Sequence, residues 1–332
     1  MFTGCAGLEI SFMWKRPYNY KEGFVINAGL FIAGLLLQLI TGRVNLELLA
    51  YPVNIIVLVL FLAGLIIIHL ASKKVYFFRM LSSLQFAFPS IASVVILIIF
   101  MGIFSQFQSD VKLSGMMGRL GLRQMLSAWY FVLIFLWLIV ILGMVIIRKA
   151  SRFNFKKDIP FMLNHLGLFI ALLGGILGSA DLQRLKLVAS TGNIEWRAFD
   201  SRQNMVELPL AIQLNHFTID EYPPKLILIK DEYRDLIMFE REPRRYVSDV
   251  TVYTQSGKII NGTIEVNKPL KIEGWKIYQS SYDKSKGKWS TVSILELVRD
   301  TWMPVVYVGI GMMIAGAVCM FVFIPKRKEE EV

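Results

Sequence analysis

FMLNHLGLFIALLGG, residues 161–175, is an apolar stretch that holds one histidine, His165, beside Asn164. With the residues up to 180 it is long enough to cross a bilayer core, which takes about 20 helical residues. Five more stretches have this character, and the chain of 332 residues is 55% apolar with a mean hydropathy of +0.53. The sequence therefore predicts an integral membrane bundle of six transmembrane helices. The predicted spans are residues 24–42, 51–70, 86–105, 128–147, 161–180 and 302–324.

The distribution of Lys and Arg predicts the orientation of these spans. Fourteen cations lie on one set of flanks, whereas the other short loops hold only Arg43, Lys112, Arg119 and Arg123. Because Lys and Arg accumulate in cytoplasmic loops, both termini are predicted to be cytoplasmic, in a multi-pass protein of the inner (cytoplasmic) membrane. The net charge of +11 lies mostly on these inner flanks and forms no continuous basic face, so we expect membrane lipid but no nucleic acid as a partner.

The segment between the fifth and sixth spans is predicted to be an extracytoplasmic all-β domain, either a sandwich or a partly closed barrel. It has short segments rich in β-branched and aromatic residues, separated by turn residues. Ser256 with Gly257 and Asn261 with Gly262 are predicted to form two tight turns. The predicted parts of the chain are an N-terminal hairpin (1–79), a second transmembrane region (80–180), the β domain (181–301), and the last span with a cytoplasmic tail (302–332).

No common enzymatic motif is present in the sequence: it has no GxxxxGK[ST], GxSxG or HExxH pattern. His216, in LNHFTID, is interpreted as a packing or surface residue of a strand. Glu265 alternates with apolar neighbours, as expected on a solvated strand face. The two cysteines, Cys5 and Cys319, form no CxxC pair and are interpreted as free thiols.

His165 is the residue for which a binding role is considered first. It comes five residues after Pro160, about 7 to 8 Å into the helix. An ionisable side chain at that depth is uncommon and is a hypothesis for a functional site. The alternative is a hydrogen bond between helices in which Asn164 takes part.

Haem is the natural ligand for a single imidazole in lipid, because neutral imidazole binds iron and a porphyrin is largely apolar. His165 is thus a candidate axial ligand of haem iron, and cations on the inner flanks could pair with the propionates. The small residues Gly167, Ala171, Gly175 and Ser179 recur every four positions and are predicted to form a separate packing stripe on the same helix.

His69, at the end of the second span, is predicted to lie at a similar depth to His165. A site with two histidine ligands within one chain is therefore possible, although an interfacial histidine with its tip in water is the simpler interpretation. Trp137 is a candidate for stacking on a porphyrin, with helix packing as the alternative.

Four stretches in this order resemble the ResB (also called CcsB) family of the System II cytochrome c biogenesis pathway: LPLAIQLNHFTIDEYPP, RRYVSDVTVYTQSG, IEVNKPLKIEGWKIYQSSYD and LELVRDTWMPVVYVGIGMMIAG. The resemblance extends back through MLSSLQFAFPSIASVVILIIFMGIF, LGLRQMLSAWYFVLIFLWLIVILG and NHLGLFIALLGG, and it covers about residues 80–325. The ordered set is specific, whereas any single apolar span is not.

The resemblance implies a subunit of a cytochrome c haem lyase that is not a complete enzyme by itself. Members of this family work with a tryptophan-rich CcsA-type (ResC-type) partner to bring haem b outward for attachment to apocytochrome c. A histidine in the span before the outer domain is taken as an axial haem ligand in fused relatives, and His165 matches it. A separate thioredoxin-like thiol reductase is also implied, since this chain has no outer cysteines.

Departures from the family pattern leave alternatives open. The first two spans have no counterpart in the usual four-span form, and Lys268 stands where many relatives have histidine. One alternative is an assembly scaffold for the CcsA-type partner that binds no haem itself. Another is a small-molecule transporter or sensor, although paired intramembrane carboxylates and broken-helix repeats are missing from the sequence.

Overall fold

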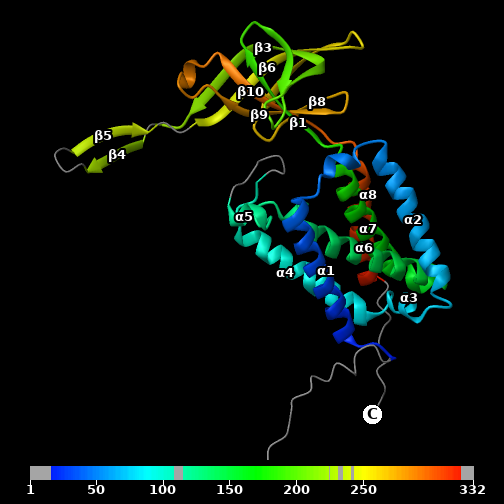
Figure 1. Ribbon diagram of the computed structural model, residues 1–332. Coiled ribbons are helices and arrows are strands. Elements are labelled where there is room, and N and C mark those ends of the chain that lie inside the picture. The colour runs from blue at the N-terminus through cyan, green and yellow to red at the C-terminus, as the bar shows by residue number, and fades with distance from the viewer. Residues whose placement is uncertain (1–15, 108–114, 224, 231–234, 241–242, 323–332) are drawn as a thin grey trace, which may run out of the picture. The chain divides into compact units, whose positions relative to one another are not determined.

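The computed structural model describes residues 16–107, 115–223, 225–230, 235–240 and 243–322. The chain divides into two compact units, a helical unit (Met1–Asp181 with Trp302–Val332) and a β unit (Leu182–Thr301). In the described part, six helices are long and apolar enough to cross a membrane, which confirms the predicted number of spans and indicates a multi-pass membrane protein. These helices are α1 (Tyr20–Thr41), α2 (Val53–Ala71), α4 (Leu84–Ile103), α6 (Trp129–Ala150), α7 (Phe155–Ser179) and α8 (Met303–Val322) (Figure 1).

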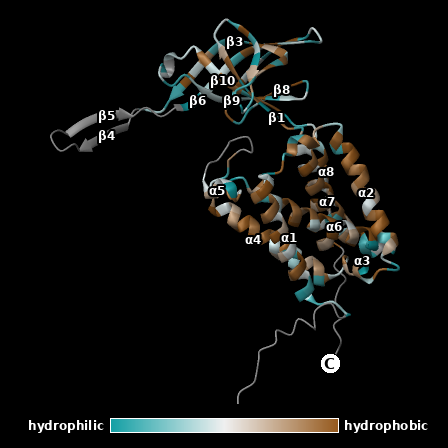
Figure 2. Cartoon of the chain, in the orientation of Figure 1, coloured by the Kyte–Doolittle hydropathy of each residue, from teal (hydrophilic) through white to brown (hydrophobic). Residues whose placement is uncertain are grey.

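The long helices consist mostly of hydrophobic residues, as Figure 2 shows, and many of these residues are exposed on the outside of the helical unit. Ile40, Leu60 and Phe321 expose 80%, 66% and 78% of their surfaces. Several buried positions on the helices are instead polar, among them Gln38 and Asn54. Exposed apolar residues and buried polar residues are the reverse of the pattern in water-soluble proteins. They are expected for a helical bundle in lipid, because lipid tails are as apolar as leucine and helices associate there through close packing and hydrogen bonds.

Helix α1 contacts its neighbours through small and polar residues. A Cβ atom on Gly34 would lie 2.3 Å from the Cα of Tyr130 in α6, so the two backbones approach as closely as glycine allows. Near the end of α1, Gln38 accepts a hydrogen bond from the backbone N–H of Trp129 (3.3 Å) and donates to the carbonyl of Arg119 (3.4 Å). These contacts join α1, α6 and the last residue of the short helix α5 (Met116–Arg119).

The β unit contains an eight-stranded antiparallel sheet in the order β7-β6-β3-β2-β1-β10-β9-β8, and a separate two-stranded ribbon, β4-β5. The strands are β1 (Gln183–Ser190), β2 (Ile194–Phe199), β3 (Met205–Glu221), β4 (Lys225–Lys230), β5 (Asp235–Glu240), β6 (Pro243–Thr254), β7 (Ile259–Glu265), β8 (Leu270–Ile272), β9 (Trp275–Tyr282) and β10 (Val292–Arg299). The sheet curves into a nearly closed barrel, since its edge strand β7 contacts β8 and β9 at the other edge.

A β-bulge in β3 explains why His216 is exposed. Leu208, Leu210, Ile212 and Leu214 alternate inward and are buried, and the register shifts between Leu214 and His216. The next buried apolar residue of the strand is therefore Phe217, one position out of phase. His216 lies on the exposed surface, as expected for a surface residue of a strand.

The predicted turn at Asn261 and Gly262 is wrong. Both residues lie inside β7, paired with Thr251 and Val250 of β6. Gly262 is needed for close packing: a Cβ atom there would lie 2.8 Å from the side chain of Leu270 in β8, so glycine allows the two edges of the sheet to approach each other. The turn predicted at Ser256 and Gly257 does connect β6 to β7, with Gly257 at φ +79°.

Hydrogen bonds inside the barrel join strands that are distant in the sheet order. Ser248 on β6 donates to the Oε1 atom of Gln279 on β9 (2.6 Å), and its hydroxyl is 2.8 Å from that of Ser293 on β10. All three side chains are buried, and each has a partner within the group. The barrel therefore has a satisfied polar cross-link within an otherwise apolar core.

Candidate functional site

His165 lies on α7, whose start differs from the predicted one. The helix begins at Phe155, six residues before the predicted start of the span, and Pro160 lies inside it. The first turn is held by Asp158, which accepts a hydrogen bond from the backbone N–H of Asn154 (2.9 Å) and pairs with Lys149 of α6 (2.8 Å). An acidic side chain in the first turn also interacts favourably with the helix dipole, so the sequence before Pro160 continues the helix.

The imidazole of His165 is oriented by its own helix. Its Nδ1 atom donates to the carbonyl of Phe161 (2.9 Å), and the two rings stack with centroids 3.8 Å apart and planes at 20°. In the neutral imidazole this bond puts the proton on Nδ1 and leaves a lone pair on Nε2. No hydrogen bond joins Nε2 to a described residue, and the side chain is half-buried. The available nitrogen is thus the one that a ligand would contact.

The opposite face of α7, called the glycine face here, packs against α8. A Cβ atom on Gly167 would lie 2.6 Å from the carbonyl of Gly309, and one on Gly178 would lie 2.4 Å from Trp302. The residues of the glycine face are Asn164, Gly167, Ala171, Gly174 and Gly178.

The predicted packing stripe is partly wrong. Gly167 and Ala171 contact α8 as expected, but a Cβ atom on Gly175 would meet nothing within 4 Å, and Ser179 is exposed. The real spacing after Ala171 is three and then four residues, which follows the helical period of about 3.6, whereas steps of four drift around the helix. Asn164 likewise points to α8, close to Gly316, and not to the side of His165.

The side of α7 that carries His165 is called the histidine face, and it consists of Phe161, His165, Leu168 and Leu172. At about 3.6 residues per turn these residues share one side, between the face packed in the helical core and the open surface. Leu168 exposes 37% of its surface, and Phe161 and Leu172 are partly buried. The residues described by the structure do not enclose this face, so any large ligand here needs a further wall.

His69 has a different environment. It lies in the last turn of α2, and its Nε2 atom is 3.3 Å from the hydroxyl of Ser151, the residue that follows α6. Within the described residues no ring contact or hydrogen bond joins His69 to His165. The two imidazoles therefore have separate partners. Trp137 is partly buried in the core between α6 and its neighbours.

An acidic residue that the sequence did not single out joins three helices. Asp181 follows α7, and its Oδ2 atom accepts hydrogen bonds from Trp302 Nε1 (2.7 Å) and Asn54 Nδ2 (2.6 Å), while Oδ1 accepts from the backbone N–H of Tyr51 (2.7 Å). Burial alone would raise the pKa of Asp181, but these hydrogen bonds outweigh it and hold the pKa below its ordinary value. The polar Asn54 in an apolar span was the available signal.

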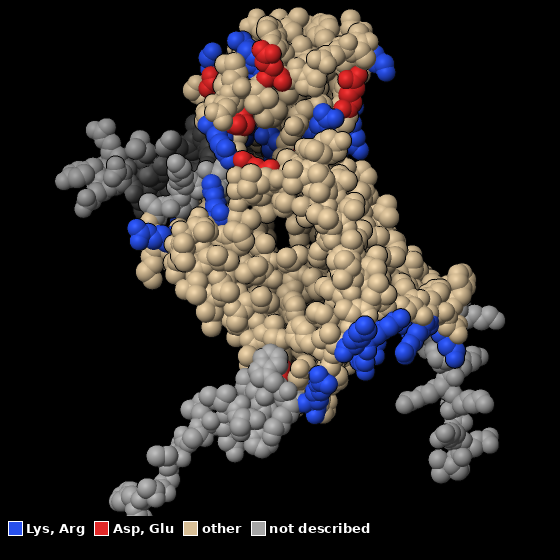
Figure 3. Space-filling model, turned by 45° about the vertical axis from the view of Figure 1, so that its right-hand side comes forward, with Lys and Arg blue, Asp and Glu red and all other residues tan. Residues whose placement is uncertain are grey.

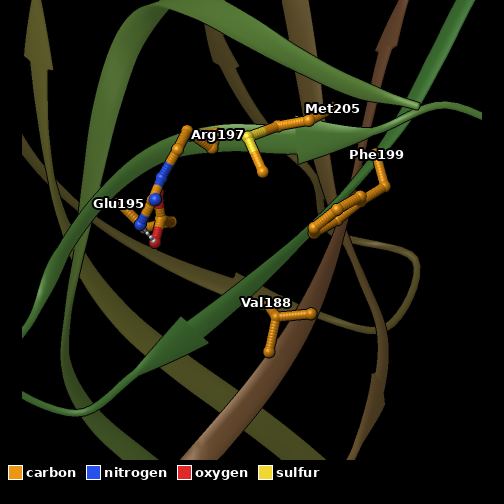
Figure 4. Close-up of a pocket in the computed structure, with 5 residues that line it drawn as sticks. All are labelled: Val188, Glu195, Arg197, Phe199 and Met205. Atoms are coloured by element: carbon orange, nitrogen blue, oxygen red, sulfur yellow. Dashed lines mark hydrogen bonds and ion pairs between the residues drawn. The ribbon is translucent and has the colours of Figure 1, made fainter. Parts of the chain in front are cut away.

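The β unit has a shallow hollow with a volume of about 180 Å³ between β1, β2 and β3 (Figure 4). Glu195 and Arg197 pair on one side (2.8 Å), and this pairing is the main reason that the pKa of Glu195 is lowered. Val188, Phe199 and Met205 form the rest of the wall. The two charges neutralise each other, so the hollow combines a paired carboxylate and guanidinium with an apolar wall.

Two further positions on the β unit, Glu265 and Lys268, are structural. Glu265 pairs with Arg245 and with Lys268 (3.3 Å), and the bond from Arg245 is the largest cause of its lowered pKa. Lys268 therefore neutralises a carboxylate. Among the described residues no group of three or more His, Cys, Asp or Glu side chains could hold a metal ion.

Comparison with known proteins relates this geometry to a family. Residues 158–295 match the ResB-like family, and no curated protein matches the chain. A solved structure of the cytochrome c heme lyase CcmF is similar at 11% identity and a TM-score of 0.35, covering 93% of this chain and 46% of that one. This chain thus spans less than half of that protein, and so distant a likeness carries no argument. The family match takes in His165 and most of the β unit, and this chain therefore contains a ResB-like region.

Proposed function

We propose that this chain is an inner-membrane subunit of a System II cytochrome c haem lyase, and that it takes part in moving haem b across the membrane and presenting it for attachment to apocytochrome c. The observation that carries the proposal is the match of residues 158–295 to the ResB-like family. That family supports a part in cytochrome c biogenesis. Passage of haem along this chain is the finer proposal.

The proposed orientation follows from the positive charges of the helical unit. Lys and Arg side chains gather at one end of this unit (Figure 3). Two basic segments meet there, because Arg148 at the end of α6 donates to the hydroxyl of Ser82 (2.9 Å). Cytoplasmic loops collect such charges. The basic end is thus assigned to the cytoplasm, and the β unit, inserted between α7 and α8, to the extracytoplasmic side.

The histidine face fits one side of a porphyrin held as cargo. Nε2 of His165 has the free lone pair that haem iron takes as an axial ligand, and Phe161, Leu168 and Leu172 supply apolar contacts. Because this face is open, a CcsA-type partner is proposed to cover the other side of the haem. Lys149 already pairs with Asp158, so it is less available to a propionate than Arg152.

His69 is a weaker candidate than His165 for a second axial ligand of the haem iron, because Ser151 already lies within hydrogen-bond distance of its Nε2 atom. Apocytochrome c is proposed to dock on the β unit, and a thioredoxin-like reductase is proposed to keep its cysteines reduced. Attachment itself is assigned to the complex and not to this chain.

The test is an absorption spectrum of this chain purified after coexpression with the CcsA-type partner. A b-type spectrum is expected in the wild-type complex, with loss of most of that signal in His165→Ala and recovery on adding imidazole. His216→Ala, at an exposed position of β3, is the matched control and should leave the spectrum unchanged. His69→Ala measured beside them tests the second ligand.

The openness of the histidine face also favours the rival hypothesis, a scaffold for the partner that holds no haem. A scaffold predicts that the complex assembles and that His165→Ala retains its full haem content. That result would remove His165 as a ligand.

A further inference from the structure

A groove in the helical unit lies outside residues 158–295, which match the ResB-like family, and is not used by the proposed function. Its volume is about 600 Å³, and helices α1, α4 and α6 form most of it, together with residues 120–125. From Phe24 to Leu35 it follows twelve residues of α1, which rise about 16 Å over eleven steps of 1.5 Å. The groove is therefore long and narrow.

The wall of the groove is mostly apolar and includes several aromatic residues. Phe24, Phe31 and Phe100 line it and also expose 44%, 37% and 49% of their surfaces, so the groove opens at the outside of the helices. That outside is the apolar surface described above, and a ligand would enter from the lipid phase. None of the described residues that line the groove is charged, which disfavours an anionic or cationic head group.

Two buried polar atoms belong to side chains of this wall and have no hydrogen-bond partner among the described residues: Oδ1 of Asn27 and the hydroxyl of Tyr130. The side chains are only 3% and 2% exposed. The amide nitrogen of Asn27 is already used, since it donates to the carbonyl of Gly23 (2.8 Å) and to the hydroxyl of Ser90 (3.2 Å). A buried polar atom without a partner is costly and calls for an explanation.

We propose that this groove binds a neutral lipid whose head carries a hydroxyl group. The apolar body of such a molecule matches the length and lining of the groove. A hydroxyl group both donates and accepts, so it suits Asn27 Oδ1, which only accepts, and the Tyr130 hydroxyl, which needs an acceptor. Because both atoms are buried, the contact requires these two side chains to turn toward the groove when the lipid binds. An uncharged head also agrees with the absence of charge in the lining. The site would make α1 a lipid-binding element of the chain.

The probe that tests this proposal is hexadecanol with a photoactivatable diazirine in its chain, compared with the same molecule as its methyl ether. Both are added to the full chain in phosphatidylcholine nanodiscs, and labelled peptides are identified by mass spectrometry. The alcohol should label peptides from α1, α4 and α6 about fivefold more strongly than the ether, the ratio that a net hydrogen bond of about 1 kcal/mol gives.

Two variants distinguish the head group from the groove. Tyr130→Phe removes only a hydroxyl without a partner, so it should keep the fold and lower labelling by the alcohol and by the ether about fivefold each, because the oxygen of either probe can accept from that hydroxyl; Tyr20→Phe, on an exposed position of α1, is its control. Ala28→Trp should fill the groove and abolish labelling by both probes. Its control is Gly29→Trp, where a Cβ atom meets nothing within 4 Å.

Equal labelling by alcohol and ether in the wild-type chain would overturn the proposed head group, as would an unchanged alcohol signal in Tyr130→Phe. Unchanged labelling in a folded Ala28→Trp variant would overturn the groove as the site. If Ala28→Trp does not fold, the Tyr130→Phe comparison alone decides. None of these readouts depends on haem, so the outcome is independent of the proposed function.

Discussion

The glycine face and the histidine face belong to the same helix, α7, but differ in how closely they are packed. On the glycine face, Gly167 brings the backbone against α8 and Gly178 brings it against Trp302, just before α8, with no room even for a methyl group. On the histidine face, larger side chains surround an imidazole whose Nε2 atom has no described partner. This contrast shows that the helix is fixed from one side while the other stays available to a ligand or a partner protein.

The largest expected effect comes from blocking the glycine face. Gly167→Leu would drive side-chain atoms into the carbonyl of Gly309, so we expect destabilisation of about 3 kcal/mol or failure to fold. The measurement is the thermal midpoint of the purified chain in detergent. Gly175→Leu is the matched control, because a Cβ atom there meets nothing within 4 Å. Equal midpoints in the two variants would mean that α7 and α8 are not closely packed.

A smaller effect is expected at the end of the glycine face, where Trp302 donates to Asp181. Trp302→Phe removes that donor and should destabilise the helical unit by about 2 kcal/mol, as for a hydrogen bond to a charged group. Trp196→Phe, at an exposed position of β2, is the control and should change the midpoint little. A loss as large in Trp196→Phe would show that the effect is not specific to this contact.

The pH dependence of the Trp302→Phe effect gives a finer test of the same contact. The pKa of Asp181 is lowered in the folded chain, so its stabilisation is fully present above its ordinary pKa of 3.8 and is lost as the pH falls through the folded value. The difference between wild type and Trp302→Phe should therefore shrink in acid. A difference that stays constant far below that pH would indicate that the indole stabilises through packing alone.

The apolar spans and the β character of residues 181–301 could be predicted because each depends on local composition and period. The histidine face could be proposed for the same reason, since one imidazole in an apolar run stands out. Asn261 with Gly262 has the composition of a turn although it lies in β7. At Gly262 the close approach of Leu270 is a tertiary contact that local sequence does not reveal, and it favours a strand over a turn.

The groove and the Asp181 contacts could not be predicted from local sequence. Asn27 and Tyr130 are 103 residues apart in the sequence. They line the same groove because α1 and α6 pack closely at Gly34. Asp181 likewise joins the start of α2 to residues that flank α7 and α8. Such sites depend on which helices are neighbours, and hydropathy does not determine that.

The proposed haem site rests on a bond between Nε2 of His165 and the iron, and replacing the ligand atom probes that bond. His165→Cys, coexpressed with the CcsA-type partner, exchanges an imidazole for a thiolate, which changes the electronic structure of the iron. We expect a shifted absorption maximum and altered electron paramagnetic resonance signals in the purified complex. Spectra identical to those of the wild-type complex, at equal haem content, would exclude His165 as the ligand.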